Sequence, residues 1–334
     1  MKALVTGATG FIGSAVVREL LKNGEEVKAL VRPGSNRLNL QGLAVEEARG
    51  DVTDLDSVRK AVAGCDRVYH AAALYTVDDP PEAYYRVNVD GTRNVLRACL
   101  DAGVRRVVHT STVAAVGSAA SGAEVDEESL WNLGEFFLPY ATTKYMAEFE
   151  AYRALARGLP IVVVNPTAPL GARDLKPTPT GKLVVDFLNG KMPLYPELYI
   201  NVIDADDVAL GHRLAMERGR PGERYILGNQ NMRVSEILAA LARLTGAPMP
   251  KAAIPYAVAL AVSFLVELVM TRLLGRYTMF SVASARFMKC RLHASNAKAV
   301  RELGLTVTPV DECLRKSVRW FHEHGYIKRP IRVP

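Results

Sequence analysis

The sequence has few cysteines and no residue spacing that indicates a metal site. Its four cysteines lie far apart, unlike those of a disulfide-rich scaffold or a zinc site. They are Cys65, Cys99, Cys290 and Cys313. The six histidines show no metal-ligand spacing either, so no metal is predicted. We interpret the cysteines as small buried apolar residues of a protein in a reducing cytoplasm.

An export signal and a membrane-spanning run are also missing. A signal peptide has an apolar core of about 7 to 15 residues, but the first predicted strand begins at residue 2, so we expect a cytoplasmic protein. The most apolar segment is 254–270. It runs uninterrupted only from 254 to 266, and a bilayer requires roughly 18 to 20 residues. We favour a buried or lid-forming helix, with peripheral membrane attachment as the alternative.

The charge of the chain is not concentrated. The net charge is +7, yet no run of five or six Lys or Arg occurs, so nucleic-acid binding is not predicted. Hydrophobic residues make up 49% and charged residues 23%, as in ordinary globular proteins. A chain of 334 residues exceeds the roughly 250 to 300 that one core serves. We therefore expect two lobes.

Short apolar runs alternate with helical patterns in the first half of the chain. Predicted strands lie at 2–6, 26–31, 45–49, 66–70, 105–110 and 160–165. Continuous runs such as 161–164 suit strands buried on both faces of a parallel sheet. The pattern predicts an α/β fold, a doubly wound Rossmann sheet over 1–165, to which the strands and helix of 199–228 return.

The remainder, 166–334, is predicted to form a smaller substrate-binding lobe. Six prolines between 166 and 196 indicate loop, with one helix near 181–189. Mostly helical sequence then runs from 228 to about 324. This organisation places the substrate beside a cofactor domain.

A glycine-rich loop joins the first strand to the first helix. Its sequence is Thr6-Gly7-Ala8-Thr9-Gly10-Phe11-Ile12-Gly13. Gly7 permits a tight turn, Gly10 lets backbone N–H groups approach a pyrophosphate, and Gly13 allows close helix packing. The loop therefore predicts a dinucleotide contact through residues 7 and 9–13. A glycine turn without ligand is the alternative.

The end of the second strand favours NADP(H). Positions 27–45 carry no acid that could hold a ribose 2′-hydroxyl. Arg32, supported by Arg37 and Ser35, can instead contact a 2′-phosphate. NAD remains open, because Arg32 could stack on the adenine or lie in solvent.

Tyr140 and Lys144 lie four residues apart on a helix that begins near Pro139, so they share one face. A phenol with a pKa near ~10 is a poor base at neutral pH. We expect the adjacent Lys144 ammonium and an oxidised nicotinamide to lower the pKa of Tyr140. Thr112, in a hydroxyl-rich segment after the fifth strand, can hydrogen-bond the reacting oxygen, although it could also serve only the turn.

Several motifs occur in the order typical of one family. They are the glycine loop, Gly50-Asp51-Val52-Thr53-Asp54, Ala71-Ala72-Ala73, Asn88-Val89-Asp90-Gly91-Thr92, residues 110–117 and Tyr140/Lys144. Together they resemble the extended short-chain dehydrogenases/reductases of the NAD-dependent epimerase/dehydratase family. The likeness is strongest to the hopanoid-associated sugar epimerase and dihydroflavonol-4-reductase-like groups.

The resemblance implies a catalytic set and a cofactor path. Thr112 lies where the family usually has a catalytic Ser. The implied cofactor contacts are Asp51 and Val52 at the adenine, Ala71, Ala72 and Ala73 along the path, Asn88 near the nicotinamide half, Lys144, and Pro166 and Thr167 at the carboxamide. Asp51 as a turn residue, the alanines as packing and Asn88 as a structural hydrogen-bonder are alternatives. A homodimer is a further implication.

Three functions follow from these features. The first is a reductase, or reverse dehydrogenase, that acts on a carbonyl or secondary alcohol of a small molecule in an apolar pocket shaped by 167–198 and 250–290. The second is a nucleotide-sugar epimerase, favoured by Asn165-Pro166-Thr167. Against it, Ile200 replaces a phosphate-binding Arg, and no Arg-x-Gly-Asp occurs near 290–297. The third is a cofactor-sensing regulator, which would usually lack the Tyr/Lys pair.

Overall fold

The larger half of the molecule is built around one seven-stranded parallel sheet, as expected for a Rossmann fold. The structure is a computed structural model that describes all residues except 76–78, 120–122, 137, 276–277 and 279–280. The strand order is β10-β6-β5-β4-β1-β2-β3. The strands are β1 (Lys2–Thr6), β2 (Glu26–Val31), β3 (Glu46–Arg49), β4 (Arg67–His70), β5 (Arg106–Thr110), β6 (Ile161–Pro166) and β10 (Arg224–Leu227).

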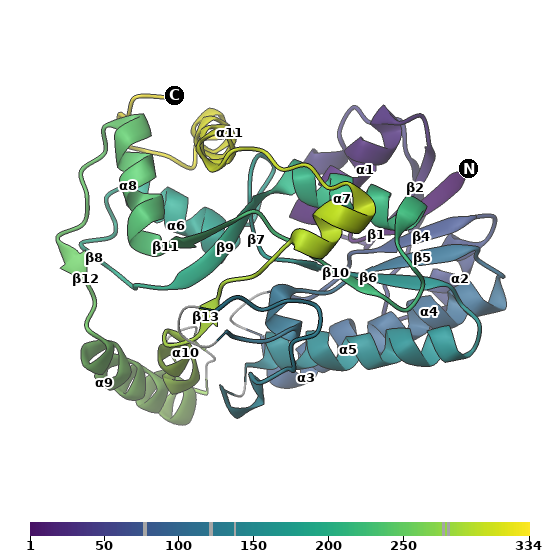
Figure 1. The fold of residues 1–334 in the computed structure, drawn as a ribbon, viewed down its shortest axis with the longest axis horizontal. Coiled ribbons are helices and arrows are strands. Elements are labelled where there is room, and N and C mark those ends of the chain that lie inside the picture. Colours follow the sequence, from purple (N-terminus) through teal and green to yellow (C-terminus); the bar gives the residue numbers. More distant parts are fainter. Residues whose placement is uncertain (76–78, 120–122, 137, 276–277, 279–280) are drawn as a thin grey trace.

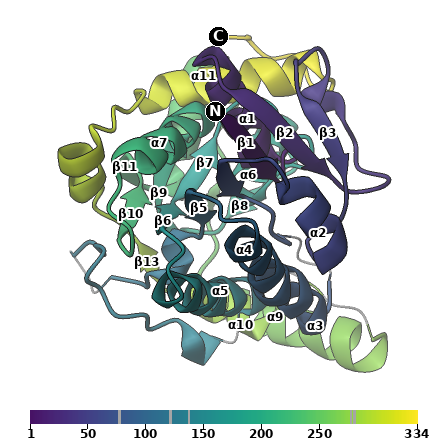
Figure 2. The same cartoon turned by 90° about the vertical axis from the view of Figure 1, so that its right-hand side faces the viewer.

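Helices cover both faces of this sheet (Figures 1 and 2). On one face lie α1 (Phe11–Lys22) and α7 (Ala205–Arg218); on the other lie α2 (Leu55–Val62), α4 (Gly91–Asp101) and α5 (Pro139–Ala156). All six residues of β6 are buried, as its continuous apolar run predicts. Shorter turns connect these elements: η1 (Leu38–Leu40), α3 (Pro81–Tyr84), η2 (Tyr85–Asp90), η3 (Val113–Ala115) and η4 (Gly134–Phe136).

The second lobe combines helices with small sheets. Its four-stranded sheet contains β7 (Ala168–Leu170), β9 (Tyr199–Asp204), β11 (Gln230–Arg233) and β13 (Arg291–Leu292). A two-stranded sheet pairs β8 (Leu194–Tyr195) with β12 (Ala252–Ala253). The remaining elements are α6 (Pro179–Leu188), α8 (Val234–Thr245), α9 (Tyr256–Glu267), η5 (Leu268–Leu273), α10 (Val282–Phe287) and α11 (Val310–Glu323). The turn η6 (Ala299–Leu303) instead packs on α7 and β10 of the Rossmann half.

One predicted strand lies in the other sheet. The sequence predicts that 199–228 returns to the Rossmann sheet, and α7 and β10 do lie there. The strand at its start, β9, instead pairs with β7, β11 and β13. The place beside β6 is taken by β10, which pairs with it in parallel register. The prediction for 199–204 is therefore wrong, because hydrophobic patterning does not identify a strand's neighbour.

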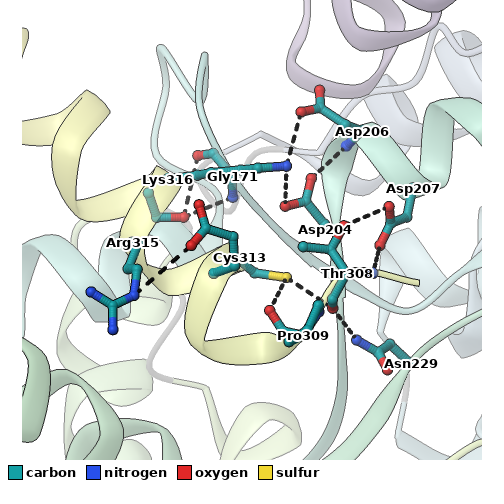
Figure 3. Close-up of polar contacts among 12 residues, drawn as sticks. Gly171, Asp204, Asp206, Asp207, Asn229, Thr308, Pro309, Cys313, Arg315 and Lys316 are labelled. Carbon is teal, nitrogen blue, oxygen red and sulfur yellow. Dashed lines mark hydrogen bonds and ion pairs between the residues drawn. The ribbon is translucent and has the colours of Figure 1, made fainter. Parts of the chain in front are cut away.

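Polar contacts attach α11 to the first turn of α7 (Figure 3). Asp204 caps α7 by accepting a hydrogen bond from the Asp206 backbone at 2.8 Å. The Lys316 ammonium pairs with the Asp204 carboxylate at 2.9 Å and with the Asp206 carboxylate at 3.3 Å. Thr308 donates through its hydroxyl to Asp207 at 2.9 Å. Carboxylates at a helix N-terminus are stabilised by the helix dipole. Through the contacts of Lys316 and Thr308, this junction joins the last helix of the second lobe to the Rossmann layer.

Helix α9 is exposed, contrary to the expectation of a buried helix for 254–270. Within α9 only Ser263 is buried, whereas Phe264 and Leu265 are each 59% exposed. The apolar composition indicated burial, but the contacts that would cover the helix are not supplied by the described part of the chain. None of the helices in that part is long and apolar enough to cross a membrane. All four cysteines are free and buried, as expected.

Candidate active site

The loop between β1 and α1 packs so closely that side chains are excluded. Gly7 has a φ of +70°, and a Cβ there would lie 2.7 Å from the Ala72 backbone nitrogen. A Cβ on Gly13 would overlap the Gly7 carbonyl. Gly10 closes the turn by donating its N–H to that carbonyl at 2.9 Å. Glycine is therefore required at positions 7 and 13 by turn geometry and by helix packing.

The N-terminus of α1 suits an anion. Gly10 provides no side-chain cap, and the first turn, which begins with Phe11 and Ile12, contains no acid. The first N–H groups of a helix lack partners within the helix and carry partial positive charge. Thr9 lies just before this turn, and its carbonyl accepts a hydrogen bond from buried Asn39 at 3.3 Å. The loop fits the pyrophosphate of a dinucleotide.

The two arginines after β2 differ in their contacts. Arg32 is exposed, and within the described residues no hydrogen bond or ion pair engages its guanidinium. Arg37 pairs with Glu47 at 3.4 Å. Asp51 accepts hydrogen bonds from the Thr53 backbone and hydroxyl at 2.9 and 2.8 Å, as a turn residue does. Of these side chains, Arg32 is the one available to a 2′-phosphate.

Thr112, Tyr140 and Lys144 meet where β5 ends and α5 begins. The Thr112 side chain lies close enough to the Tyr140 phenol to favour its ionised form. The Lys144 ammonium donates to the Thr110 carbonyl at 2.6 Å, and its side chain is buried. Because Pro139 opens α5, Tyr140 lies in the first turn and Lys144 one turn later on the same face. The structure therefore brings the three expected catalytic residues together.

Burial shifts the pKa values of Tyr140 and Lys144 in opposite directions. Burial raises the pKa of Tyr140, with a smaller contribution from Tyr75, and the neighbouring Thr112 side chain opposes the rise. Burial also lowers the pKa of Lys144 to about 8, against the attraction of Glu148. In the chain by itself desolvation dominates and the ammonium is turned toward Thr110. The phenol thus stays protonated at neutral pH. The expected lowering of the Tyr140 pKa by Lys144 together with an oxidised nicotinamide stays a prediction.

Asn88 holds the loop of residues 71–74 against α5. Its Oδ1 accepts from the Leu74 N–H at 2.7 Å, and its Nδ2 donates to the Thr143 hydroxyl at 3.1 Å and to the Leu74 carbonyl at 3.3 Å. The side chain is fully buried. The Ala72 N–H donates to the Thr6 hydroxyl, which fixes this loop beside Gly7 as well. Asn88 therefore positions the loop, in line with the structural interpretation of this residue.

The segment 165–167 is occupied by internal contacts. Asn165 is fully buried and donates to the Thr112 carbonyl at 3.0 Å and to the Glu148 carboxylate at 2.8 Å. Thr167, also buried, donates to the Asn201 amide oxygen at 2.9 Å. Pro166 ends β6 between them. The Asn165 amide nitrogen and the Thr167 hydroxyl are thus engaged within the protein, whereas the buried Asn165 amide oxygen has no hydrogen-bond partner among the described residues.

The structure adds residues that sequence reasoning missed. The Tyr75 ring meets the Tyr140 ring edge-on, with 4.4 Å between centroids. Glu148 is buried one turn after Lys144, and burial raises its pKa. The spacing of four residues could have identified Glu148. Tyr75 lies in irregular chain, where no periodicity points to it.

Comparisons with known proteins agree with this geometry. The family model described as "NAD dependent epimerase/dehydratase family" matches residues 3–228. A Synechocystis sp. protein with the provisional name dihydroflavonol 4-reductase is 41% identical over 97% of this chain and 95% of its own. "Sterol demethylase protein B" of Methylococcus capsulatus is 37% identical, with coverages of 98% and 100%. The crystal structure of a nucleoside-diphosphate-sugar epimerase from Pseudomonas aeruginosa has a TM-score of 0.82 at 28% identity, covering 98% of this chain and 99% of that one.

Proposed function

Because the chain belongs to the NAD dependent epimerase/dehydratase family, we propose that it is an NADPH-dependent reductase of a carbonyl group in an apolar small molecule. The observation that carries this proposal is the buried Tyr140 phenol, which is protonated at neutral pH, lies beside Thr112 and is followed one turn later by the buried Lys144 ammonium. A positioned acid beside a hydroxyl donor is what reduction of a carbonyl requires.

The residues of this chain would move a proton to the substrate oxygen. A reduced nicotinamide, when bound, supplies the hydride that the carbonyl carbon accepts. Tyr140 gives its phenolic proton to the carbonyl oxygen, which becomes an alcohol, and the resulting phenolate regains a proton from solvent. The Thr112 hydroxyl hydrogen-bonds the same oxygen, and the Lys144 ammonium stabilises the phenolate.

Reduction is favoured over sugar epimerisation by residues of this chain. Ile200 lies in β9 opposite Met232 and Leu292, so an apolar side chain stands where a phosphate-binding Arg is expected. Asn165 and Thr167 make internal hydrogen bonds. The names of two similar proteins also include a reductase and a sterol demethylase component. These observations support an apolar carbonyl substrate. The Tyr140/Lys144 pair argues against a purely cofactor-sensing regulator.

The reductase can be tested with purified protein by following nicotinamide absorbance. We expect steady NADPH oxidation with apolar ketones or aldehydes, and no interconversion of nucleotide sugars. Sugar interconversion without net NADPH consumption would establish the epimerase instead. Absence of both activities, with full biological activity retained in a Tyr140→Phe strain, would establish the regulator.

Arg32 allows a separate test of cofactor choice. We expect Arg32→Ser to raise the KM for NADPH about ten- to hundredfold, because charge-assisted hydrogen bonds to a phosphate are lost, and to leave the KM for NADH unchanged. Arg105→Ser is the matched control, because Arg105 is also exposed but precedes the amino end of β5, whereas Arg32 follows the carboxyl end of the parallel strand β2. Equal NADPH affinity in both variants would rule out the role given to Arg32.

A further inference from the structure

The exposed side of α9 and η5 forms a continuous apolar surface, which we call the α9 face. It consists of Val258, Val262, Phe264, Leu265, Leu268 and Val269, each 39 to 59% exposed. Positions 258, 262, 265 and 269 follow helical periodicity, so they lie along one side of the helix. A contiguous set of large exposed apolar side chains marks an interaction site more often than a scattered one does.

The opposite side of α9 faces the protein. Ser263 is buried, and the Glu267 carboxylate accepts a hydrogen bond from the Val282 N–H at 2.7 Å, at the start of α10. Glu267 is the one acid between Lys251 and Arg291, and it is directed to α10. The single acid of α9 is therefore engaged on the inner side of the helix, where it contacts α10.

The part of the sequence that contains α9 is rich in bases. Between residues 251 and 291 the chain carries one acid and six bases, which are Lys251, Arg272, Arg276, Arg286, Lys289 and Arg291. Lys251 and Lys289 are both exposed, and the Lys289 ammonium lies 4.1 Å from the centre of the Tyr256 ring at the start of α9. An exposed apolar helix side with the Lys289 ammonium at its start matches an anionic lipid surface, in which apolar side chains enter the acyl boundary and cations meet headgroups.

The α9 face also lies near the candidate active site. Figure 1 shows α10 between α9 and the beginning of α5, and Figure 2 shows these helices at one end of the molecule. Phe287 of α10 meets Phe136 edge-on, with 6.2 Å between ring centroids. Cys290, just after α10, belongs to the same apolar cluster as Ala141, the neighbour of Tyr140. Helices α9 and α10 thus lie between the α9 face and the start of α5.

From these contacts, we propose that the α9 face docks on an anionic lipid bilayer, from which the enzyme takes its apolar carbonyl substrate. The docking stands on the α9 face, on the Lys289 ammonium at its start and on the excess of bases in this part of the sequence. The source of the substrate rests on the proposed function.

Docking is tested by flotation of the purified full chain with lipid vesicles. We expect it to float with vesicles of 70% phosphatidylcholine and 30% phosphatidylglycerol, less with phosphatidylcholine alone, and less in 0.5 M NaCl. The triple variant Val258→Ser/Val262→Ser/Leu265→Ser should bind at least about tenfold more weakly. Its matched control is Leu130→Ser/Val300→Ser/Val307→Ser, which changes exposed apolar residues outside the α9 face and should bind like the unmodified chain.

Two results would overturn docking. One is the absence of flotation of the unmodified chain with either vesicle. The other is equal binding by the two triple variants. If the chain is instead a dimer in sedimentation velocity, does not float, and becomes a monomer in the α9 triple variant, the α9 face is an interface between copies.

The substrate source has its own readout. We expect the α9 triple variant to show a raised KM for a long-chain ketone carried in vesicles, with kcat unchanged, and unaltered kinetics on a short water-soluble ketone. Equal KM values for the vesicle-borne ketone in both proteins would overturn this part. If neither ketone is reduced by the unmodified chain, the proposed function fails, while the flotation result still decides docking.

Discussion

Helices α5 and α9 both depart from the usual distribution of residues, in which charged side chains are exposed and apolar side chains are buried. Helix α5 buries charged side chains, among them Lys144, Glu148 and Glu150. Helix α9 exposes large apolar ones, led by Phe264 and Leu265. Both departures oppose folding, because buried charges lose hydration and exposed apolar groups gain nothing from burial. Each is therefore expected to serve a function.

The difference lies in where the partners are. In α5, Lys144 donates to the Thr110 carbonyl and Glu148 accepts from Asn165, so both charges are satisfied by the chain itself. In α9 the apolar side chains stay uncovered by the described residues. The two proposals above follow this difference: a small substrate would enter the protein beside α5, whereas a large surface outside the protein would cover α9.

The largest effect is expected from Tyr140→Phe in α5. Loss of the phenolic acid should lower kcat by about 10²- to 10⁴-fold, with cofactor affinity unchanged in a fluorescence titration. Tyr145→Phe is the matched control, because Tyr145 lies on the same helix and its ring stacks on Trp131 at 4.1 Å. Equal activity of the two variants would remove Tyr140 from the mechanism and make the polar interior of α5 purely structural.

The buried Lys144 ammonium should lower the free energy of unfolding, and an apolar side chain at this position should raise it again. Its pKa is lowered by burial to about 8 from an ordinary 10.5, so below pH 8 the charged form disfavours folding, by about 3 kcal/mol. Lys144→Met removes this cost but also loses the hydrogen bond to the Thr110 carbonyl. We therefore expect a net rise of about 2 kcal/mol in the free energy of unfolding at pH 7. Urea unfolding measures this.

The pH dependence of that stability supplies the control. As pH rises from 8 toward 10.5, the folded form of the unmodified chain loses the Lys144 charge and gains stability relative to Lys144→Met. A difference between the two proteins that does not shrink over this range would show that the ammonium is not the source of the cost.

The same group should limit activity at high pH. Reduction needs the Lys144 ammonium, whereas the raised pKa of Tyr140 keeps the phenol protonated. We expect kcat/KM to fall about tenfold per pH unit above pH 8. Lys144→Arg should move this limb upward by more than one unit, since a guanidinium stays charged. A limb at the same pH in both proteins would assign it to another group.

The sequence predicted the Rossmann half well, because its signals are local. The glycine loop, the alternation of strands and helices, and the four-residue spacing of Tyr140 and Lys144 each depend on neighbours in the chain. The place of β9 and the exposure of α9 depend on which elements pack against them. An apolar run such as 254–266 predicts a helix equally well whether the chain or a partner covers it.

The same distinction separates the site residues that were predicted from those that were missed. Asn39 fixes the glycine loop through Thr9 and the carbonyl of Arg173, which is 134 residues away in the chain. Tyr75 reaches Tyr140 from an irregular segment. Asn88 was identified by motif, but its use as a support for residues 71–74 appears only in the folded chain. Contacts made across such distances leave no periodic signal in the sequence.

The smallest effect on stability is expected from substitutions on the α9 face, where large apolar side chains are exposed. Val258→Ser/Val262→Ser should change the free energy of unfolding by no more than about 0.5 kcal/mol in urea, because both side chains are 48% exposed. The matched change Val107→Ser/Val108→Ser, at fully buried positions of β5, should cost several-fold more. A large loss of stability in the α9 variant would mean that the chain itself covers this face, and α9 would then be an ordinary buried helix.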